Sequence, residues 1–383
     1  MDLQYGQEQR ILRDTAERFL AANYDYRKFR AIANSEAGFS NDIWAELAAM
    51  GWLGLPFAEA DGGLAASAVE VSILMEAFGK ALVLEPYLAN VVLAGGLVTT
   101  LGSAAQRAEL LGALIDGKLK LAFANDDRAP TRATKRGDGY VLSGAKTAVL
   151  AAPMADVILT SAAMPSGGTG VFALPRLARG LVIRPYRTVD GGRAADIEMS
   201  NVTALASALL GGNEDADAAI AATIERAIAA ASADAVGAIA AMVSASVDYT
   251  KTRVQFGQPI SKFQVLAHRL VDMKVREEEA RASCLLATLS LDGPAGNRAR
   301  AVSGAKAKIG RNARFVAQNA IQTHGAIGTT DELALGAYAK RLMAYEILFG
   351  STREHLRRYA AMIADPALAS AGLLIEPRSP AAA

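Results

Sequence analysis

The stretch that organises this chain reads Arg253-Val254-Gln255-Phe256-Gly257-Gln258-Pro259-Ile260-Ser261-Lys262-Phe263-Gln264. An apolar helical pattern runs up to Arg253 and breaks at Gly257–Pro259, because proline lacks a backbone donor and disfavours helix in the residue before it. A second helical pattern begins near Ser261. The sequence therefore predicts a junction between two helices that carries a guanidinium, an aromatic ring and a carboxamide.

Two interpretations of this junction are open. Arginine grips phosphate oxygens through paired donors and phenylalanine offers a stacking surface, so Arg253, Phe256 and Gln264 suit the diphosphate and adenine of a large cofactor. The alternative is a helix N-cap with a buried Phe256 and a solvated Arg253. Local chemistry alone does not separate the two.

Composition narrows the classes of partner. The 383 residues are enough for two or three domains with a large core, and a net charge of +1 excludes the basic field that nucleic acid or an anionic membrane would require. The single cysteine, Cys284, excludes an internal disulfide and fits a reducing compartment. The stretch Met1–Gly6 has neither the basic nor the apolar part of a signal sequence, so we expect a cytoplasmic protein.

The period of the apolar pattern changes twice along the chain, which predicts an α+β fold. Residues 1–118 have helical spacing, residues 119–210 have short β-like runs typical of a small barrel or sandwich, and residues 211–366 are helical again. The expected β runs are Lys120–Ala124, Gly139–Leu142, Asp156–Ser161, Val171–Leu174, Leu181–Pro185 and Ala195–Met199. Residues 367–383 are expected to form a mobile tail. The Ala-rich region 216–247 contains Glu225, Arg226 and Asp234, so we expect a core helix there and no membrane span.

This order of segments, with the stretch 253–264, resembles the acyl-CoA dehydrogenase family over nearly the whole chain. Further segments carry the resemblance: Gln322-Thr323-His324-Gly325-Ala326-Ile327-Gly328, Trp52-Leu53-Gly54-Leu55 with Gly62-Gly63, and Gly144-Ala145-Lys146 before a strand that ends in Asp156. Within the family the chain looks most like the small subunits of two-component bacterial enzymes of the pimeloyl-CoA and steroid side-chain types.

The resemblance implies a reaction and a division of labour. In this family a carboxylate removes the α-proton of an acyl-CoA thioester while FAD accepts hydride from the β carbon, and an electron-transferring flavoprotein is the expected acceptor. In the family's tetramers each FAD crosses a subunit boundary. One subunit holds the isoalloxazine ring, and its neighbour holds much of the ADP half.

The residues that the family uses for a neighbour's ADP half are well represented here. Arg253 matches the pyrophosphate-binding arginine, Phe256 and Gln264 match its adenylate-side companions, and Gln255 falls at a further contact position. In the second loop Gln322 matches the family's glutamine. The resemblance therefore implies one set of FAD-binding residues: Arg253, Gln255, Phe256, Gln264, Gln322 and Gly325. Ala326 departs from the family's usual glycine, which matters only if its φ is positive.

The flavin-ring half is poorly represented. The loop Ala122–Arg128 lacks the hydroxyl and the Gly-Ser pair that the family places against the flavin. Ala148 and Leu150 stand where the family has a ring-flanking tryptophan and a threonine. The usual catalytic glutamate falls on Phe349, and the alternative base position on the long helix falls near Ala227.

We therefore assign no catalytic residue. Glu225 and Glu346 are the alternative bases, but helical geometry turns Glu225 away from position 227, and Glu346 more often pairs with Lys340 or Arg341. His268, His324 and His355 are single packing residues. The spacing of His, Cys and acidic residues predicts no metal site.

The resemblance, with these departures from it, thus implies a subunit of a heterotetrameric acyl-CoA dehydrogenase that contributes the ADP-side half of a shared FAD site beside a larger catalytic subunit. Two alternatives stay open. One is a self-sufficient homotetramer with an atypical base, and the other is a structural subunit without flavin. The acyl chain is not specified by the residues.

Overall fold

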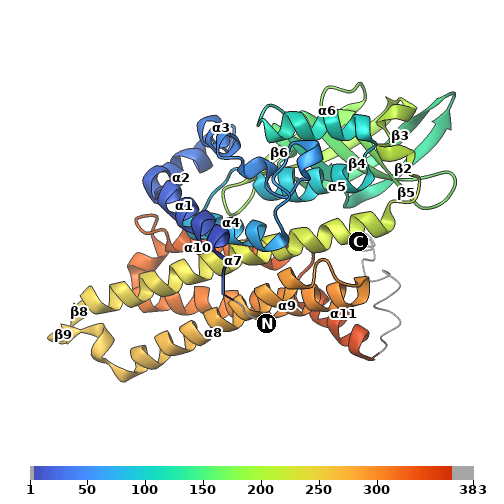
Figure 1. The fold of residues 1–383 in the computed structure, drawn as a ribbon. Helices are drawn as coiled ribbons and strands as arrows, with labels where there is room; N and C mark the ends of the chain where they lie inside the picture. The colour runs from blue at the N-terminus through green and yellow to red at the C-terminus, as the bar shows by residue number, and fades with distance from the viewer. Residues whose placement is uncertain (1–3, 365–383) are drawn as a thin grey trace. The chain divides into compact units, whose positions relative to one another are not determined.

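The computed structural model describes residues 4–364 (Figure 1); the predicted tail 367–383 lies outside them. The described chain falls into two compact units. The bundle unit comprises residues up to Ala31, Ala68–Val83 and the chain from Ile228, and the sheet unit comprises Ile32–Ser67 and Leu84–Ala227. Helices precede and follow a central sheet, so the predicted α+β fold is confirmed. The predicted domain boundaries 1–118, 119–210 and 211–366 stay predictions.

The N-terminal third is helical, as the periodicity predicts. Its helices are α1 (Gln7–Asn23), α2 (Tyr26–Asn34), α3 (Asn41–Ala49), α4 (Ala68–Ala81), α5 (Gly96–Leu101) and α6 (Ala104–Ile115), with short 3₁₀ turns η1 (Trp52–Gly54) and η2 (Glu59–Asp61). The segment η3 (Leu88–Gly95), expected as plain α-helix, is a π-helix that leads into α5. Ser103 and Gln106 form a capping box that starts α6.

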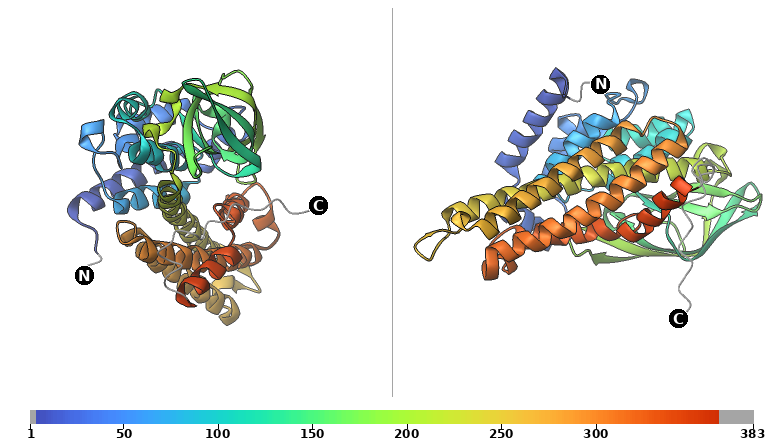
Figure 2. Two further views of the ribbon diagram at one scale, coloured as in Figure 1. Left: turned by 90° about the vertical axis from the view of Figure 1, so that its right-hand side faces the viewer. Right: turned by 90° about the horizontal axis from the view of Figure 1, so that it is seen from below.

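The middle third is one curled sheet (Figure 2). Its strands are β1 (Leu121–Ala124), β2 (Asp127–Arg136), β3 (Gly139–Leu150), β4 (Val157–Ala163), β5 (Thr169–Pro175), β6 (Leu181–Arg187) and β7 (Arg193–Ala204). They run in the order β1-β4-β2-β3-β7-β6, with β5 also paired to β4. The expected β runs fall within or beside these strands. Strand β2 is missing from the prediction, because half of its residues are charged, most are exposed, and the strand shows little apolar alternation.

The core of the sheet unit lies inside the curl. Alternate side chains of β7 (Ala195, Ile197 and Met199) point into it, while Asp196 and its outward neighbours point away. Tyr140 and Phe172 meet edge to face at 5.2 Å between ring centroids. Arg193, at the start of β7, is held by backbone carbonyl groups. Its guanidinium donates hydrogen bonds to the carbonyl oxygens of residues 33, 35, 36, 191 and 192.

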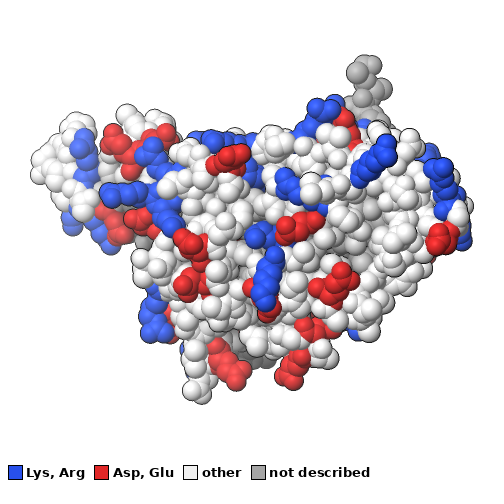
Figure 3. Space-filling view, turned by 90° about the horizontal axis from the view of Figure 1, so that it is seen from above, with Lys and Arg blue, Asp and Glu red and all other residues white. Residues whose placement is uncertain are grey.

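The C-terminal third is a helical bundle. Its elements are α7 (Asp217–Thr252), α8 (Gln264–Leu289), α9 (Ala295–His324), α10 (Leu335–Ile347) and α11 (Thr352–Ala364). Helix α9 packs against α8, α10 and α11 (Figure 2). By length and composition α7 could cross a membrane, but 83% of its most apolar window is buried within the described chain, which is the environment expected for a core helix. On the face drawn in Figure 3, acidic and basic side chains are interspersed.

In the bundle unit α4 and α7 cross in close contact, with one glycine from each helix at the crossing. A methyl group on Gly79 would stand 1.8 Å from the carbonyl oxygen of Asp234, and one on Gly237 would stand 2.0 Å from that of Glu76. Both contacts are with backbone, which cannot rotate away. The close approach therefore requires glycine at both positions.

We expect Gly237→Ala to lower the free energy of unfolding by about 1–3 kcal/mol, because the added methyl group forces α4 and α7 apart. Gly336→Ala is the matched control, since a methyl group at this helical glycine meets no atom within 4 Å. It should raise the stability by about 0.5–1 kcal/mol through helix propensity. Urea titration measures both, and a Gly237→Ala chain as stable as the wild type would refute the tight crossing.

Candidate functional site

The segment after α7 forms a small β-hairpin. Strand β8 (Val254–Gln255) pairs with β9 (Gln258–Pro259) around the tip Phe256–Gly257. Both tip residues have positive φ, 53° and 80°, which is the pattern of a type I′ turn. A 3₁₀ turn, η7 (Ile260–Lys262), follows, so α8 begins at Gln264 and not near Ser261 as the sequence predicts. In the sequence, Gly257 after Phe256 was the feature that could have indicated this hairpin turn.

The hairpin holds Arg253 at its base and Phe256 at its tip. The backbone of Arg253 is fully bonded, since its N–H donates to Tyr249 O at 2.8 Å and its carbonyl accepts the Ile260 N–H at 2.8 Å. Phe256 is 91% exposed and meets Phe263 edge to face at 6.0 Å. The alternative with a buried Phe256 is therefore wrong. The side chains of Gln255 and Gln264 are exposed as well.

The second predicted loop lies at the same end of the bundle. Tyr249, one turn before Arg253, stacks on His324 with ring centroids 4.3 Å apart and donates to the His324 carbonyl at 3.3 Å. Gly325 ends α9 with a φ of 66° and opens η8 (Gly325–Thr329), and Gln322 is exposed on the last turn of α9. His324 is buried, and burial lowers its pKa, which agrees with a packing role. Ala326 has no positive φ, so its methyl group causes no backbone strain.

These side chains form a cation, a ring and three carboxamides that point to solvent. Within residues 4–364, the Arg253 guanidinium has no ion pair and no hydrogen bond joins it to Gln255, Gln264 or Gln322. An exposed guanidinium beside an exposed ring suits a diphosphate linked to a planar base. These side chains therefore fit the ADP end of FAD chemically.

The sheet unit has a different arrangement at Ala148 and Leu150. Ala148 has a φ of 53°, and its N–H donates to Asp196 Oδ1 at 3.3 Å. The Thr147 hydroxyl donates to the same oxygen at 2.8 Å, and Arg128 lies 3.5 Å from Oδ2. The polar groups beside position 148 are thus bonded to Asp196. Sequence reasoning missed this carboxylate, because an acidic residue on the outward face of a strand looks like an ordinary solvated charge.

The connection between β1 and β2 is held by a buried lysine. Lys146 Nζ donates to Asn125 O at 3.0 Å and to Ser161 Oγ at 2.8 Å, and it lies 2.7 Å from Asp127 Oδ1. Burial lowers the pKa of the Lys146 ammonium, against the raising effect of Asp127. In this turn, for which the resemblance implies flavin contacts, the Asn125 carbonyl and the Asp127 carboxylate are thus bonded to Lys146.

The positions expected for a base hold no carboxylate. Phe349 lies in the loop between α10 and α11 with a φ of 55°, and its carbonyl accepts His355 Nε2 at 3.0 Å. Ala227 on α7 is fully buried, and Glu225 two residues earlier is half-buried. A phenyl ring and a methyl group cannot accept a proton.

Glu346 has a structural partner on the next helix. Its carboxylate accepts the Thr352 N–H at 3.2 Å and the Thr352 hydroxyl, which anchors the start of α11, and Arg314 lies 3.7 Å away. The expected pairing with Lys340 or Arg341 is wrong: among the described residues the cation within 4 Å of the Glu346 carboxylate is Arg314, and Arg341 binds Asp234 at 2.7 Å. Among the described residues no group of three or more His, Cys, Asp or Glu could hold a metal ion.

Family models match the chain on both sides of the sheet. The model for the N-terminal domain of acyl-CoA dehydrogenase matches residues 6–118, and the model for the C-terminal domain matches residues 218–364. The match to the C-terminal model includes the β8–β9 hairpin, the C-terminal ends of α7 and α9, and the loop that contains Phe349.

Curated relatives and solved structures agree with these matches. Acyl-CoA dehydrogenase FadE12 of Mycobacterium tuberculosis is 28% identical over 87% of this chain and 89% of its own length. Acyl-CoA dehydrogenase IpdE2 of Mycolicibacterium smegmatis is 27% identical over 94% of this chain and 99% of its own. A variant of the Tcur3481-Tcur3483 steroid ACAD has a TM-score of 0.85 at 27% identity, covering 95% of this chain and 99% of the other. The ChsE4-ChsE5 complex from Mycobacterium tuberculosis has a TM-score of 0.87 at 24% identity, covering 95% and 99%, and so matches in fold.

His355 should make the stability depend on pH. Burial lowers its pKa from 6.5 to about 4, so the unfolded chain binds a proton below pH 6.5 that the folded chain refuses until about pH 4. Stability should therefore fall as the pH falls through this window, by up to about 3 kcal/mol from this residue.

We expect His355→Gln to remove this pH-dependent part of the stability in urea titrations at pH 4 and 6.5. The control His268→Gln, at an exposed site, should keep it; an unchanged slope in His355→Gln would contradict the assignment.

Proposed function

The chain belongs to the acyl-CoA dehydrogenase family, and on that premise we propose that it is one subunit of a heterotetrameric acyl-CoA dehydrogenase. It supplies the residues that bind the ADP half of a shared FAD. A larger partner subunit supplies the isoalloxazine pocket, the catalytic carboxylate and the acyl-CoA site. When bound, FAD supplies the acceptor for the hydride that leaves the β carbon of the acyl group.

One observation carries the proposal: the two halves of the expected site differ in how their polar groups are bonded. Arg253, Gln255, Gln264 and Gln322 are exposed at one end of the bundle unit, next to the exposed ring of Phe256. Exposed arginine and glutamine side chains are ordinary, but a phenyl ring that is 91% exposed beside them is not, and a ligand that covers the ring would explain it. In this role Arg253 pairs with the diphosphate, Phe256 lies against the adenine, and the carboxamides and the Gly325 loop complete the contact.

In the region expected to hold the flavin ring, the polar groups are bonded to other groups of this chain. The Ala148 N–H and the Thr147 hydroxyl bind Asp196, and the carbonyl of Asn125 binds Lys146. The side chains at 148 and 150 are a methyl and an isobutyl group, without the hydroxyl that the family places there. Loss of a general base usually costs about 10²- to 10⁴-fold in rate, so a chain with Phe349 and Ala227 at the base positions needs a partner's carboxylate.

Partners and location follow from the same proposal. The Tcur3481-Tcur3483 steroid ACAD is itself named for two components, which supports a heteromeric assembly for this chain. We propose an electron-transferring flavoprotein as acceptor and the cytoplasm as location, in keeping with the buried free thiol of Cys284.

Purification separates this proposal from its alternatives. We expect the chain expressed alone to be colourless, and the tagged chain from its natural host to carry a larger subunit, FAD absorbance and acyl-CoA-dependent reduction of an electron acceptor. A yellow homotetramer that reduces the acceptor by itself would instead establish a self-sufficient enzyme. A complex free of flavin would establish a structural subunit.

Substitutions test which half of the site this chain supplies. In the host complex Arg253→Ala should weaken FAD retention about 10- to 100-fold, because a charge-assisted pair to phosphate is lost, while the charge-matched control Lys251→Ala should retain FAD. Flavin absorbance after gel filtration measures both.

Phe349→Ala tests the base position. Turnover of the complex should stay within about threefold of the wild type, since the expected cost of losing a true base is about 10²-fold or more. Initial rates with acyl-CoA measure this. If turnover falls a hundredfold in a complex that still holds FAD, position 349 lies in the reacting site. That result would contradict the proposed division of roles between the two subunits.

A further inference from the structure

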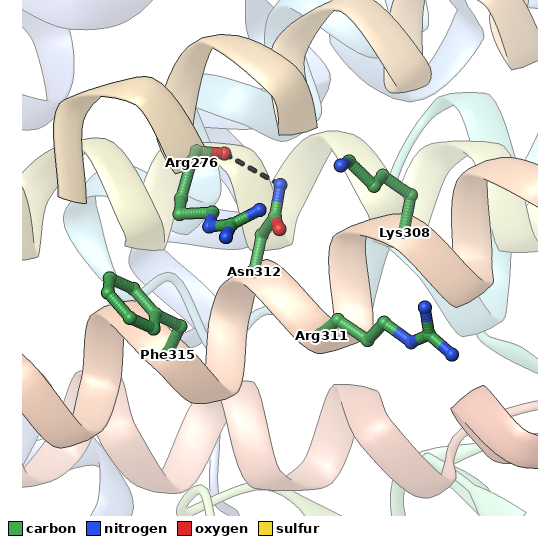
Figure 4. Close-up of a pocket in the computed structure, with 5 residues that line it drawn as sticks. All are labelled: Arg276, Lys308, Arg311, Asn312 and Phe315. Carbon is green, nitrogen blue, oxygen red and sulfur yellow. Dashed lines mark hydrogen bonds between the residues drawn. The ribbon is translucent and has the colours of Figure 1, made fainter. Parts of the chain in front are cut away.

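A second polar site lies between α8 and α9. It is a pocket of about 280 Å³ lined by Arg276, Lys308, Arg311, Asn312 and Phe315 (Figure 4). Arg276 is twelve residues beyond Gln264 on the same helix, which is about 18 Å along the axis. The pocket is therefore separate from the hairpin that carries Arg253 and Phe256.

The pocket is built by the spacing of α9. Lys308 lies three and four residues before Arg311 and Asn312, and Phe315 lies four and three residues after them, so the four residues share one face of α9, opposite Arg276 of α8. Asn312 is 2% exposed, and its amide donates to the Arg276 carbonyl at 2.9 Å and to Glu279 Oε2 at 3.2 Å. The Arg276 guanidinium lies over the Phe315 ring at 5.4 Å. Figure 4 shows it beside Asn312, with the Lys308 amine directed toward Asn312 from the other side.

The charges of this pocket are not balanced. Glu279 lies 3.0 Å from Arg276 and 2.9 Å from Lys308, so one carboxylate faces two cations. Among the residues that the structure describes, Arg311 has no ion pair. Three positive charges and one negative charge leave +2. Each guanidinium has five donors and the ammonium has three, so donors stay available after the bonds to Glu279 are made.

We propose that this pocket binds a phosphate group carried by a small molecule. A phosphate at neutral pH brings up to two negative charges, which matches the residual charge, and arginine holds phosphate through paired donors. A volume of about 280 Å³ is below the usual size of a pocket for a whole drug-sized ligand, so the pocket takes the phosphate and little of its carrier. The proposal is independent of the shared FAD site.

Calorimetric titration of the full chain with inorganic phosphate, and with glycerol phosphate as an ester, tests the site at low salt. We expect one saturable site with a dissociation constant of about 1 mM or lower. Arg311→Gln should weaken it about tenfold, since one charge-assisted contact is lost. Arg300→Gln is the control on the same helix, outside the pocket, and should leave the affinity unchanged. Glu279→Gln should strengthen binding, because it removes the competing carboxylate.

The contrast between Arg311→Gln and Arg300→Gln, which remove the same charge inside and outside the pocket, distinguishes binding in this pocket from diffuse binding to surface cations. Tighter binding of the ester would indicate an organic phosphate as the natural ligand, and equal or tighter binding of the free ion would indicate inorganic phosphate. Equal effects of Arg311→Gln and Arg300→Gln, or no saturation, would overturn the proposal. So would a glutamate-rich peptide that binds through Arg311 where phosphate does not, because the pocket would then belong to a protein interface.

Discussion

Burial of α7 is the constraint on which the bundle unit depends. A helix of mostly alanine, isoleucine and valine must be covered along its length from Ile228 onward, and its few polar groups must find partners. Gly79 and Gly237 let α4 approach to backbone contact. Asp234 receives Arg341 of α10 at 2.7 Å, and Ser232 bonds Tyr345 at 2.9 Å. These contacts position α10 and, with the stacking of Tyr249 on His324, the end of α9.

The candidate site is a consequence of how α7 ends. Tyr249 stacks on His324 in the last turns of α7, and Arg253 and the exposed Phe256 follow directly after the helix ends. The same contact brings Gln322 and Gly325 to that end from a distant part of the sequence. In the proposed function, a second chain would complete the binding of the cofactor beside these residues.

Buried polar and charged groups surround the Phe349 loop. Lys306 donates to the Tyr345 carbonyl and lies 3.7 Å from the centre of its ring, and burial lowers its pKa to about 7 against the pull of Glu346 and Glu354. Glu346 anchors the start of α11, and His355 holds the Phe349 carbonyl. Lys306, Glu346 and His355 therefore help to connect α9, α10 and α11.

The sequence by itself determined the order of helices and strands, the family resemblance and the chemical identity of positions 148, 150, 227 and 349, because these depend on local periodicity and on side-chain type. It did not reveal β2, whose charged residues conceal a strand that is held by its neighbours β3 and β4. It also left open whether Phe256 is buried, and it named the wrong partner for Glu346. Exposure and pairing are decided by segments far apart in the chain, such as Tyr249 with His324 and Asp234 with Arg341. Only the tertiary structure brings such segments together, since a residue's neighbours in space are set by packing and not by its neighbours in sequence.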